Sequence, residues 1–385
     1  MADFPRLEFS MHDVKRAGEA LKGEILWDEA KREDLLAIFR VANSWLDSHA
    51  YPMRRFQHEA SAKVRKCRVE GLVFARLKRM PSVRRKLAAL STKLDQIQDL
   101  GGCRIITSSI AGANDLIACY RDSAKHAFHN DGAYIDKPKR GGYRSHHLIY
   151  RFSGENDAEV FNGRRIEIQI RTRLQHTWAT AVESVGTLRG EELKAGKGNV
   201  DWLRLFELMS GEIAQTEGCI EPPSIPSGKE RLEEILDLNH QLSAIQFLDS
   251  MQQAVRYTSA YVQGSEPPEY FRIEFNRKTH EVTVTPHFAP KIGLKEQHQI
   301  EQSAEISGNS DINTVFVSAD SIDALRDGYP NYFGDVQLFN QNLRNIVKGK
   351  GAKEYTMPPQ QSAPNKPREA GNLSWLRPGR NRRWE

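Results

Sequence analysis

The sequence has no long hydrophobic run and only four cysteines in 385 residues. A membrane-spanning helix needs about 20 consecutive apolar residues, so none is expected, and the first residues lack the apolar stretch of a secretory signal. The cysteines (Cys67, Cys103, Cys119 and Cys219) show neither CxxC spacing nor grouping with histidines. The sequence therefore predicts no zinc-thiolate site and no disulfide framework, and it indicates a protein of the reducing cytoplasm.

A strong excess of charge is also missing. The 55 basic and 50 acidic side chains leave a net charge of only +5, which does not by itself indicate nucleic-acid binding. The length predicts two domains, or one large domain with an appendage.

The N-terminal part, up to about residue 100, has a helical and strongly charged pattern. Within it, residues 63–86 are markedly basic, and Leu72, Val73 and Leu77 are expected to form an apolar stripe on a helix. The cations around that stripe fit two interpretations, a solvated helix face or a clamp for polyphosphate. They are Arg65, Lys66, Arg68, Arg76, Lys78 and Arg79.

The central part changes to a strand pattern. Residues 103–107, 145–152 and 164–171 are rich in isoleucine and predict strands, with helices at 111–126 and 174–186. This alternation predicts an α/β or α+β fold in which helices flank a mixed β-sheet.

A proline-containing break at 218–228 indicates a linker before a smaller C-terminal α+β region at 229–350. That region begins with a predicted helix at 229–261 and continues with short strands and two short helices. The basic, proline-rich segment 351–385 predicts a disordered tail.

Side chains alternate between the two faces of a strand. In the strand 164–171, Glu167, Gln169 and Arg171 therefore lie opposite the isoleucines, either on an exposed sheet face or along a polar cleft. Asp99 precedes the strand 103–107. If these two strands are neighbours, Asp99 and Glu167 can share one Mg²⁺, which is typically held by one or two carboxylates together with substrate phosphates.

The loop 134–147 supplies complementary groups. Gly141 and Gly142 permit close approach of a ligand to the backbone, and Tyr143 is suited to stack on a base. Its phosphate-compatible cations are Lys137, Lys139, Arg140 and Arg144.

Three ordered motifs, DLGGCRI (99–105), YIDKPKRGGYRSHH (134–147) and EIQIRT (167–172) followed by QHTW, resemble the RelA/SpoT-homologue synthetase domain over residues 63–186. The resemblance implies a nucleotidyltransferase-like fold that moves pyrophosphate from ATP to a ribose 3′-hydroxyl, usually of GDP or GTP. It implies that Asp99 and Glu167 hold Mg²⁺ and that Tyr143 stacks on the acceptor base. The implied catalytic residues are Glu167, Asp99, Tyr143, Arg171 and His147. It implies that Lys139, Arg144 and His147 line the acceptor site, and Arg65, Arg76 and Arg79 are our candidates for gripping ATP. The full set of expected substrate-binding residues is Arg65, Lys66, Arg76, Arg79, Lys137, Lys139, Arg144 and Gln169.

The C-terminal extension carries Tyr329-Pro-Asn-Tyr332 between the two predicted short helices. This arrangement resembles the fused toxin–antitoxin synthetases called CapRel. The resemblance implies that residues 1–228 are a toxic pyrophosphokinase and that residues 229–350 are an autoinhibitory region with a zinc-finger-like β module. Because no cysteine follows Cys219, no thiolate zinc site is expected in that module.

In the CapRel-type interpretation, Tyr329 and Tyr332 block the ATP site, with Arg79 as a cation–π contact, until a phage capsid protein binds. The released enzyme modifies the 3′ CCA end of tRNA and stops translation as an anti-phage defence. Three alternatives stay open at the level of the sequence. The two tyrosines can be ordinary packing residues at a proline turn, the chain can be a (p)ppGpp synthetase with an ordinary regulatory region, or it can be a non-catalytic nucleotide- or RNA-binding module.

Overall fold

The structure is a computed structural model. It describes residues 4–23, 25, 27, 31–122, 125–254, 256–259, 268–308, 311–319, 322–333 and 336–353. The predicted disordered tail lies almost entirely outside these residues.

Nine strands of the described chain form one mixed sheet. In spatial order they are β3 (Ala127–Ala133), β4 (His146–Arg151), β5 (Arg165–Thr172), β2 (Gly101–Thr107), β1 (Gly71–Leu77), β9 (Ile312–Ser318), β7 (Tyr270–Asn276), β8 (Glu281–His287) and β6 (Arg256–Ser259). The pairs β2–β5 and β6–β8 are parallel and the other neighbours are antiparallel.

Helices cover both faces of the sheet. They are α1 (Met11–Ala20), α2 (Arg32–Asp47), α3 (Ala50–Lys66), α4 (Met80–Ala89), α5 (Ile110–Arg121), α6 (Arg173–Arg189), α7 (Val200–Glu217), α8 (Gly228–Leu242), α9 (Ala244–Ala254), α10 (Pro290–Ile306), α11 (Ile322–Gly328) and α12 (Gln337–Val347). Short 3₁₀ helices are η2 (Leu94–Gln96), η3 (Asn156–Phe161), η4 (Leu193–Ala195) and η5 (Pro330–Tyr332). None of the described helices is both long and apolar enough to cross a membrane.

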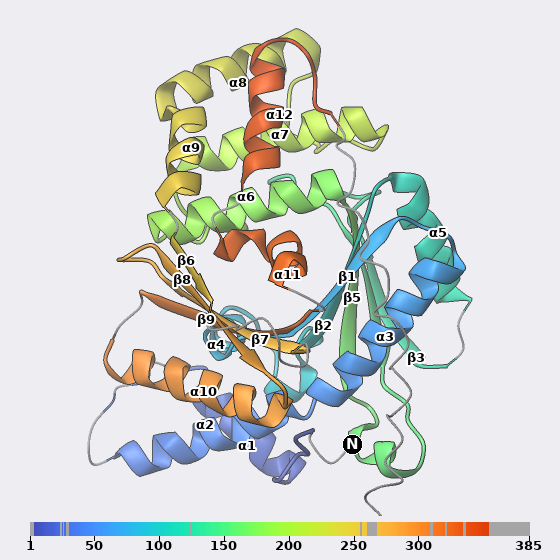
Figure 1. Cartoon of the computed structure of the whole chain (residues 1–385), viewed down its shortest axis with the longest axis vertical. Helices are drawn as coiled ribbons and strands as arrows, with labels where there is room; N and C mark the ends of the chain where they lie inside the picture. The colour runs from blue at the N-terminus through green and yellow to red at the C-terminus, as the bar shows by residue number, and fades with distance from the viewer. Residues whose placement is uncertain are drawn as a thin grey trace, which may run out of the picture.

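The isoleucine face of β5 is buried core, as its alternation predicts. Ile166, Ile168 and Ile170 are fully buried in a cluster that also contains residues of α3 and α5. On the other side of the sheet, α6 crosses the strands and α11 lies between α6 and the sheet (Figure 1). Polar residues of the central strands therefore face the space beneath α6.

The predicted mixed α+β fold is confirmed, and the three central strands agree with β2, β4 and β5 to within two residues. The helix expected around Leu72, Val73 and Leu77 is wrong, because Gly71–Leu77 forms strand β1. Its alternation of apolar side chains with Arg76 suits a strand that is buried on one face and lines a polar space on the other.

Two further expectations need correction. The helix predicted at 229–261 is interrupted at Ser243, whose φ of 47° is left-handed, so that α8 and α9 are separate. Strand β3 was not expected, because its sequence AFHNDGA lacks apolar alternation. It lies at the edge of the sheet, where one side of a strand faces solvent and the sequence is less constrained.

The C-terminal strands continue the central sheet. Strand β9 pairs with β1 through Ala75–Ser318 and Arg76–Val317, and α12 packs on α6, α8 and α9. A domain boundary at residue 228 stays a prediction. Elements on the two sides of it share one sheet and one helical core.

Candidate active site

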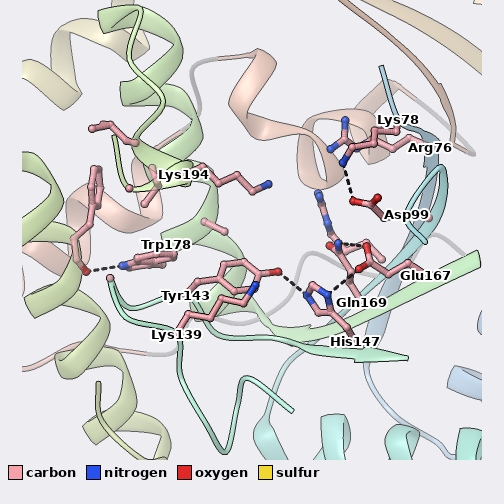
Figure 2. A pocket seen from close by; sticks show the side chains of 18 of the residues that line it. Arg76, Lys78, Asp99, Lys139, Tyr143, His147, Glu167, Gln169, Trp178 and Lys194 are labelled. Atoms are coloured by element: carbon pink, nitrogen blue, oxygen red, sulfur yellow. Dashed lines mark hydrogen bonds and ion pairs between the residues drawn. The ribbon is translucent and has the colours of Figure 1, made fainter. Parts of the chain in front are cut away.

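A cavity of about 300 Å³ lies between α6 and the polar face of the sheet (Figure 2). The residues that line it from the sheet include Phe74, Arg76, Gly102, Arg104, His147, Glu167 and Gln169, together with Lys78 just after β1. The wall opposite includes Tyr143, Trp178, Val182, Leu193, Lys194, Leu203 and Phe206. The wall formed by the sheet is therefore mainly charged or polar, and the opposite wall is largely apolar and aromatic apart from Lys194.

The sheet register brings the charged groups together. Arg76 on β1 pairs with Gly102 on β2, and Gly102 pairs with Glu167 on β5. Because glycine has no side chain, the space over β2 between Arg76 and Glu167 stays open. A Cβ built on Gly102 would meet only the Glu167 carbonyl, at 3.8 Å.

Asp99 precedes β2 and is held by two lysines. Lys78 Nζ lies 2.7 Å from Oδ2 and Lys86 Nζ lies 2.8 Å from Oδ1. Burial disfavours the charged carboxylate, but the two ammonium groups outweigh this and hold the pKa of Asp99 well below its usual value. Asp99 is therefore ionised at neutral pH.

Glu167 is the acceptor of a short hydrogen-bonded chain. His147 Nδ1 lies 2.8 Å from Oε1, and Gln169 Nε2 donates to Oε2 at 2.6 Å. The hydroxyl of Tyr143 lies 2.8 Å from His147 Nε2. Burial and the nearby Asp99 favour the neutral acid, but His147 and Gln169 outweigh them and lower the pKa of Glu167. The ionised Glu167 accepts from one ring nitrogen of His147, and the Tyr143 hydroxyl meets the other.

Burial raises the pKa of Tyr143 to about 12, so that its hydroxyl stays a donor at neutral pH. Lys139 Nζ lies 5.4 Å from the Tyr143 ring centroid and 4.1 Å from that of Tyr134. Trp178, whose indole N–H donates to the Phe206 carbonyl at 2.7 Å, continues the aromatic wall. This wall can stack on a planar base, and the nearby ammonium can hold an anion.

The loop 134–147, which contains Gly141 and Gly142, is hydrogen-bonded to α7. Gly142 has a φ of 92°, and a Cβ there would lie 2.6 Å from Cβ of Ser210. The Ser210 hydroxyl donates to the Gly142 carbonyl at 2.6 Å, and Arg144 donates to the Ser210 carbonyl at 2.5 Å. Arg144 is buried here, so it positions the loop that carries Tyr143 rather than lining the cavity.

The donor set at the charged end fits a hard cation that keeps water and phosphate ligands. Asp99 and Glu167 both line the cavity and are close enough for Asp99 to affect the pKa of Glu167. Over the described ranges, no group of three or more His, Cys, Asp or Glu side chains is arranged to enclose a metal. An all-protein cage is not required for Mg²⁺, which is bound through one or two carboxylates together with substrate phosphates.

A C-terminal segment also reaches the cavity. Tyr329, which is 2% exposed, lines it and donates its hydroxyl to the Ala75 carbonyl at 3.0 Å. Its ring packs edge-on against Phe74, with centroids 5.9 Å apart. Arg104 donates to the Gly328 carbonyl at 3.0 Å, and its guanidinium lies 6.0 Å from the Tyr329 ring.

Residues 75–185 match the family model described as "Region found in RelA / SpoT proteins". This chain carries a RelA/SpoT region. A GTP pyrophosphokinase of Escherichia coli (strain K12) is 23% identical over 177 residues, covering 44% of this chain and 23% of that protein. One of Photobacterium angustum is 23% identical over 167 residues, covering 42% and 21%. The chain thus spans less than a quarter of the length of these curated relatives.

Solved structures similar to this chain cover about half of it. The small alarmone synthetase 1 of Bacillus subtilis bound to its product pppGpp is 22% identical and covers 43% of this chain and 90% of that one, with a TM-score of 0.37. A GTP pyrophosphokinase family protein of Streptococcus pneumoniae is 19% identical and covers 45% and 88%, with a TM-score of 0.39.

Several of the residues predicted from the sequence lie around the cavity of the RelA/SpoT region. They are Arg76, Asp99, Lys139, Tyr143, His147, Glu167, Gln169 and Tyr329. Arg140, which the sequence analysis grouped with the loop cations, is also there.

Other predicted residues are not among those that line the cavity. Arg65 and Lys66 are exposed at the end of α3. Lys137 is exposed on the loop. Arg171 is buried and donates to His176 Nδ1 at 2.5 Å. Tyr332 is buried in η5.

The expected cation–π partner of Tyr329 needs correction. Arg79 is the N-cap residue of α4, and its guanidinium donates to the Asn313 side chain. Arg104 is instead the arginine beside Tyr329. Arg104 was not expected, because it lies outside both the basic stretch 63–86 and the loop 134–147 that supply the predicted cations. The alternation of DLGGCRI, with Gly102 and Arg104 on one face, is the signal that identifies it.

Lys86 and Lys194 were also missed, and Lys78 was noted only as one of many cations. Lys78 and Lys86 lie eight residues apart, at the end of β1 and in α4, and only the tertiary fold joins them at Asp99. Lys194 lies in η4, after α6, in a glycine-flanked loop with no periodic pattern.

Proposed function

We propose that this chain is an ATP-dependent pyrophosphokinase that transfers the β,γ-diphosphoryl group of ATP to a ribose 3′-hydroxyl. The observation that carries the proposal is the pair Asp99 and Glu167 at one end of a cavity that also presents Arg76, Lys78 and an aromatic base-stacking wall. Phosphoryl-type transfer depends on positioning and charge neutralisation more than on covalent chemistry by the protein. The match of residues 75–185 to the RelA/SpoT region supports it.

In the proposed step, the acceptor oxygen attacks the β-phosphorus of ATP. A new O–Pβ bond forms, the bond between Pβ and the oxygen bridging to Pα breaks, and AMP leaves with that oxygen. The hydroxyl proton passes to Glu167 or to solvent as the new bond forms. Because the pKa of Glu167 is lowered, its carboxylate is a weak base. Its main contribution is therefore to orient the hydroxyl, with His147 fixing the carboxylate.

Asp99 and Glu167 would hold a magnesium ion in the working enzyme. When bound, the ion neutralises charge that develops on the transferred phosphates and on the leaving AMP. Lys78 and Lys86 already balance the charge of Asp99. Beside a bound polyphosphate they would supply further cationic partners that are already in place.

We further propose that the C-terminal region inhibits the enzyme. Tyr329 fills part of the cavity, and Arg104, a cation suited to a nucleotide, is engaged by the Gly328 carbonyl and the Tyr329 ring. Tyr332 lies close enough to Arg76 to affect its pKa. A partner that binds the open state more tightly would release the site, and a 100-fold difference in affinity corresponds to about 2.8 kcal/mol.

For the acceptor we propose the 3′ CCA end of tRNA. The segment 126–136, which leads into Lys137 of the loop 134–147, contains no Lys or Arg, and this weakens the case for GDP or GTP as the acceptor. The stacking wall of Tyr143, Trp178 and Phe206 can accept any base. The alternative acceptor is GDP or GTP, giving (p)ppGpp, and the names of the curated relatives favour it. Incubation of β-labelled ATP with deacylated tRNA or with GDP separates the two, since label on the guanine nucleotide alone contradicts the tRNA proposal.

The biological role that follows is a toxin that stops translation in anti-phage defence, with a phage capsid protein as the release signal. Deleting the C-terminal region is a poor test, because β9 pairs with β1 and the loss would uncover core residues. A sharper test is induced expression of the Tyr329→Ala chain, which should arrest growth. The double variant Tyr329→Ala/Glu167→Gln is its inactive control. Equal growth of the two strains at equal protein levels contradicts the toxin proposal.

A further inference from the structure

Lys194 is a cavity residue outside the motifs that carry the family resemblance. It lies on η4, and Figure 2 shows its side chain reaching across the cavity from the side of Trp178 toward the side that carries Arg76 and Asp99. Its ammonium pairs with the carboxylate of Glu183, a residue of α6.

The charges around this pair do not balance. Burial disfavours ionisation of Glu183, but Lys194, Arg76 and Arg104 together outweigh it and hold the pKa of its carboxyl well below the usual value. Six Lys or Arg side chains line the cavity, against the two carboxylates of Asp99 and Glu167. The surplus positive charge at the cavity is suited to an anion.

The local backbone fixes the position of the Lys194 main chain, whereas the Lys194 side chain can still change its conformation. Leu193 is 3% exposed and packs into the helical core, which anchors η4. Gly190 and Gly196, with φ of 69° and 73°, allow the tight turns on either side of η4. The Lys194 side chain is 55% exposed, and a lysine on a flexible four-carbon stem can redirect its ammonium at little cost.

We propose that Lys194 binds the phosphates of the nucleotide in this cavity and that Glu183 is its positioning residue, which holds the ammonium ready in the empty site. This inference rests on the proposed function. When the polyphosphate enters, the ammonium shares its hydrogen bonds between Glu183 and phosphate oxygens. The loop after α6 thereby contributes a cation that faces Lys78 and Arg76 from the opposite wall.

The test measures ATP binding by calorimetry and pyrophosphate transfer by β-labelled ATP, using the full chain with and without Tyr329→Ala. Lys194→Ala should weaken ATP binding about tenfold and raise the KM for ATP to the same extent, with its melting temperature within a degree or two of the parent. Lys194→Arg should recover most of the binding. Lys197→Ala, in the same exposed loop but not among the residues that line the cavity, is the matched control and should bind ATP as the parent does.

Glu183→Gln tests the positioning role. It should raise the KM for ATP a few-fold while kcat stays within a factor of two, and Glu183→Asp should restore part of the affinity. A structural ion pair alone predicts the opposite pattern, in which the melting temperature falls for both Lys194→Ala and Glu183→Gln but ATP affinity is unchanged.

The outcomes separate this inference from the proposed function. If ATP binds in a Lys194-dependent manner but no label reaches any acceptor, the phosphate site stands and the transfer activity fails. If transfer occurs and Lys194→Ala binds ATP as tightly as the parent, the inference alone is overturned. If ATP binds neither to the full chain nor to its Tyr329→Ala variant, the Lys194 phosphate site and the proposed transfer activity are both contradicted.

Discussion

His147 Nδ1 lies 2.8 Å from Oε1 of Glu167, so that the imidazole fixes the carboxylate that faces the cavity. The other imidazole nitrogen meets the Tyr143 hydroxyl, also at 2.8 Å. Residues of β4, β5 and the loop 134–147 are thus joined in one hydrogen-bonded chain, and the position of the tyrosine proposed to stack on the base is linked to that of the proposed catalytic carboxylate.

Replacing Glu167 should abolish transfer without unfolding the protein. Glu167→Gln keeps the shape and one acceptor oxygen but removes the charge that would hold the metal and orient the hydroxyl. We expect a loss on the order of 10²-fold or more in kcat, the range for removal of a group that positions or stabilises charge in the transition state, with a melting temperature close to that of the parent. Glu159→Gln, on the exposed η3 helix, is the matched control and should be fully active. Retention of more than a tenth of the activity in Glu167→Gln would exclude the assigned role.

The link between His147 and Glu167 predicts a smaller effect. Tyr143→Phe removes the hydroxyl that is hydrogen-bonded to His147 Nε2 but keeps the ring that we propose stacks on the base. We expect kcat to fall about tenfold with little change in the KM for the acceptor, whereas Tyr143→Ala should also raise that KM because stacking is worth about 1–3 kcal/mol. Steady-state kinetics with varied acceptor distinguishes the two. Identical kinetics for both variants would contradict the division of roles.

The C-terminal segment gives a prediction about basal activity. Tyr329→Ala removes a buried ring that contributes on the order of 2 kcal/mol of apolar burial, so basal transfer should rise about tenfold or more. Gly328→Ala should act in the same direction, because its Cβ would lie 2.3 Å from Phe74 Cδ1 and force the segment to move. Tyr329→Phe, which loses only the hydrogen bond to Ala75, should have a smaller effect. Unchanged basal activity in both Tyr329→Ala and Gly328→Ala, in folded protein, counts against inhibition by this segment.

Stability should decrease already in mildly acidic solution. Burial, reinforced by Arg164, lowers the pKa of His49 to about 3, and burial beside Arg171 lowers the pKa of His176 well below its usual value. The unfolded chain protonates these histidines near pH 6.5, so their contribution to stability is present above that pH and is lost as the pH falls toward the folded pKa. The free energy of unfolding should fall by up to about 1.4 kcal/mol per pH unit for each histidine. Urea titrations at pH 7.5, 6.5 and 5.5 measure this, and a flat profile would show that neither histidine stays neutral in the folded state.

The sequence predicts the features of the fold and site that depend on neighbouring residues better than those that depend on contacts between distant segments. Strand alternation correctly placed Glu167 and Gln169 opposite the isoleucines. Sharing of one ion by Asp99 and Glu167 was made conditional on their strands being neighbours, and the parallel β2–β5 pair meets that condition. Those inferences use local periodicity, which the backbone geometry enforces.

Contacts between distant segments escaped prediction. The sequence predicts a helix where β1 forms, because basic neighbours obscure its seven-residue alternation. Its partner β9 lies some 240 positions further along the chain. Arg104 is identified as the neighbour of Tyr329 only after the C-terminal segment has folded onto β1 and β2. Lys194 comes from a loop whose sequence carries no periodic signal.

The most direct test of the central claim follows the fate of the β-phosphorus. ATP labelled at that position is incubated with the Tyr329→Ala chain, Mg²⁺ and deacylated tRNA or GDP, and AMP, ADP and labelled acceptor are quantified. Diphosphoryl transfer predicts labelled acceptor and AMP in equal amounts, with neither formed by the Glu167→Gln version of the same chain. Release of ADP with unlabelled acceptor, or equal labelling by the Glu167→Gln chain, would contradict the claim that Asp99 and Glu167 form a pyrophosphokinase site.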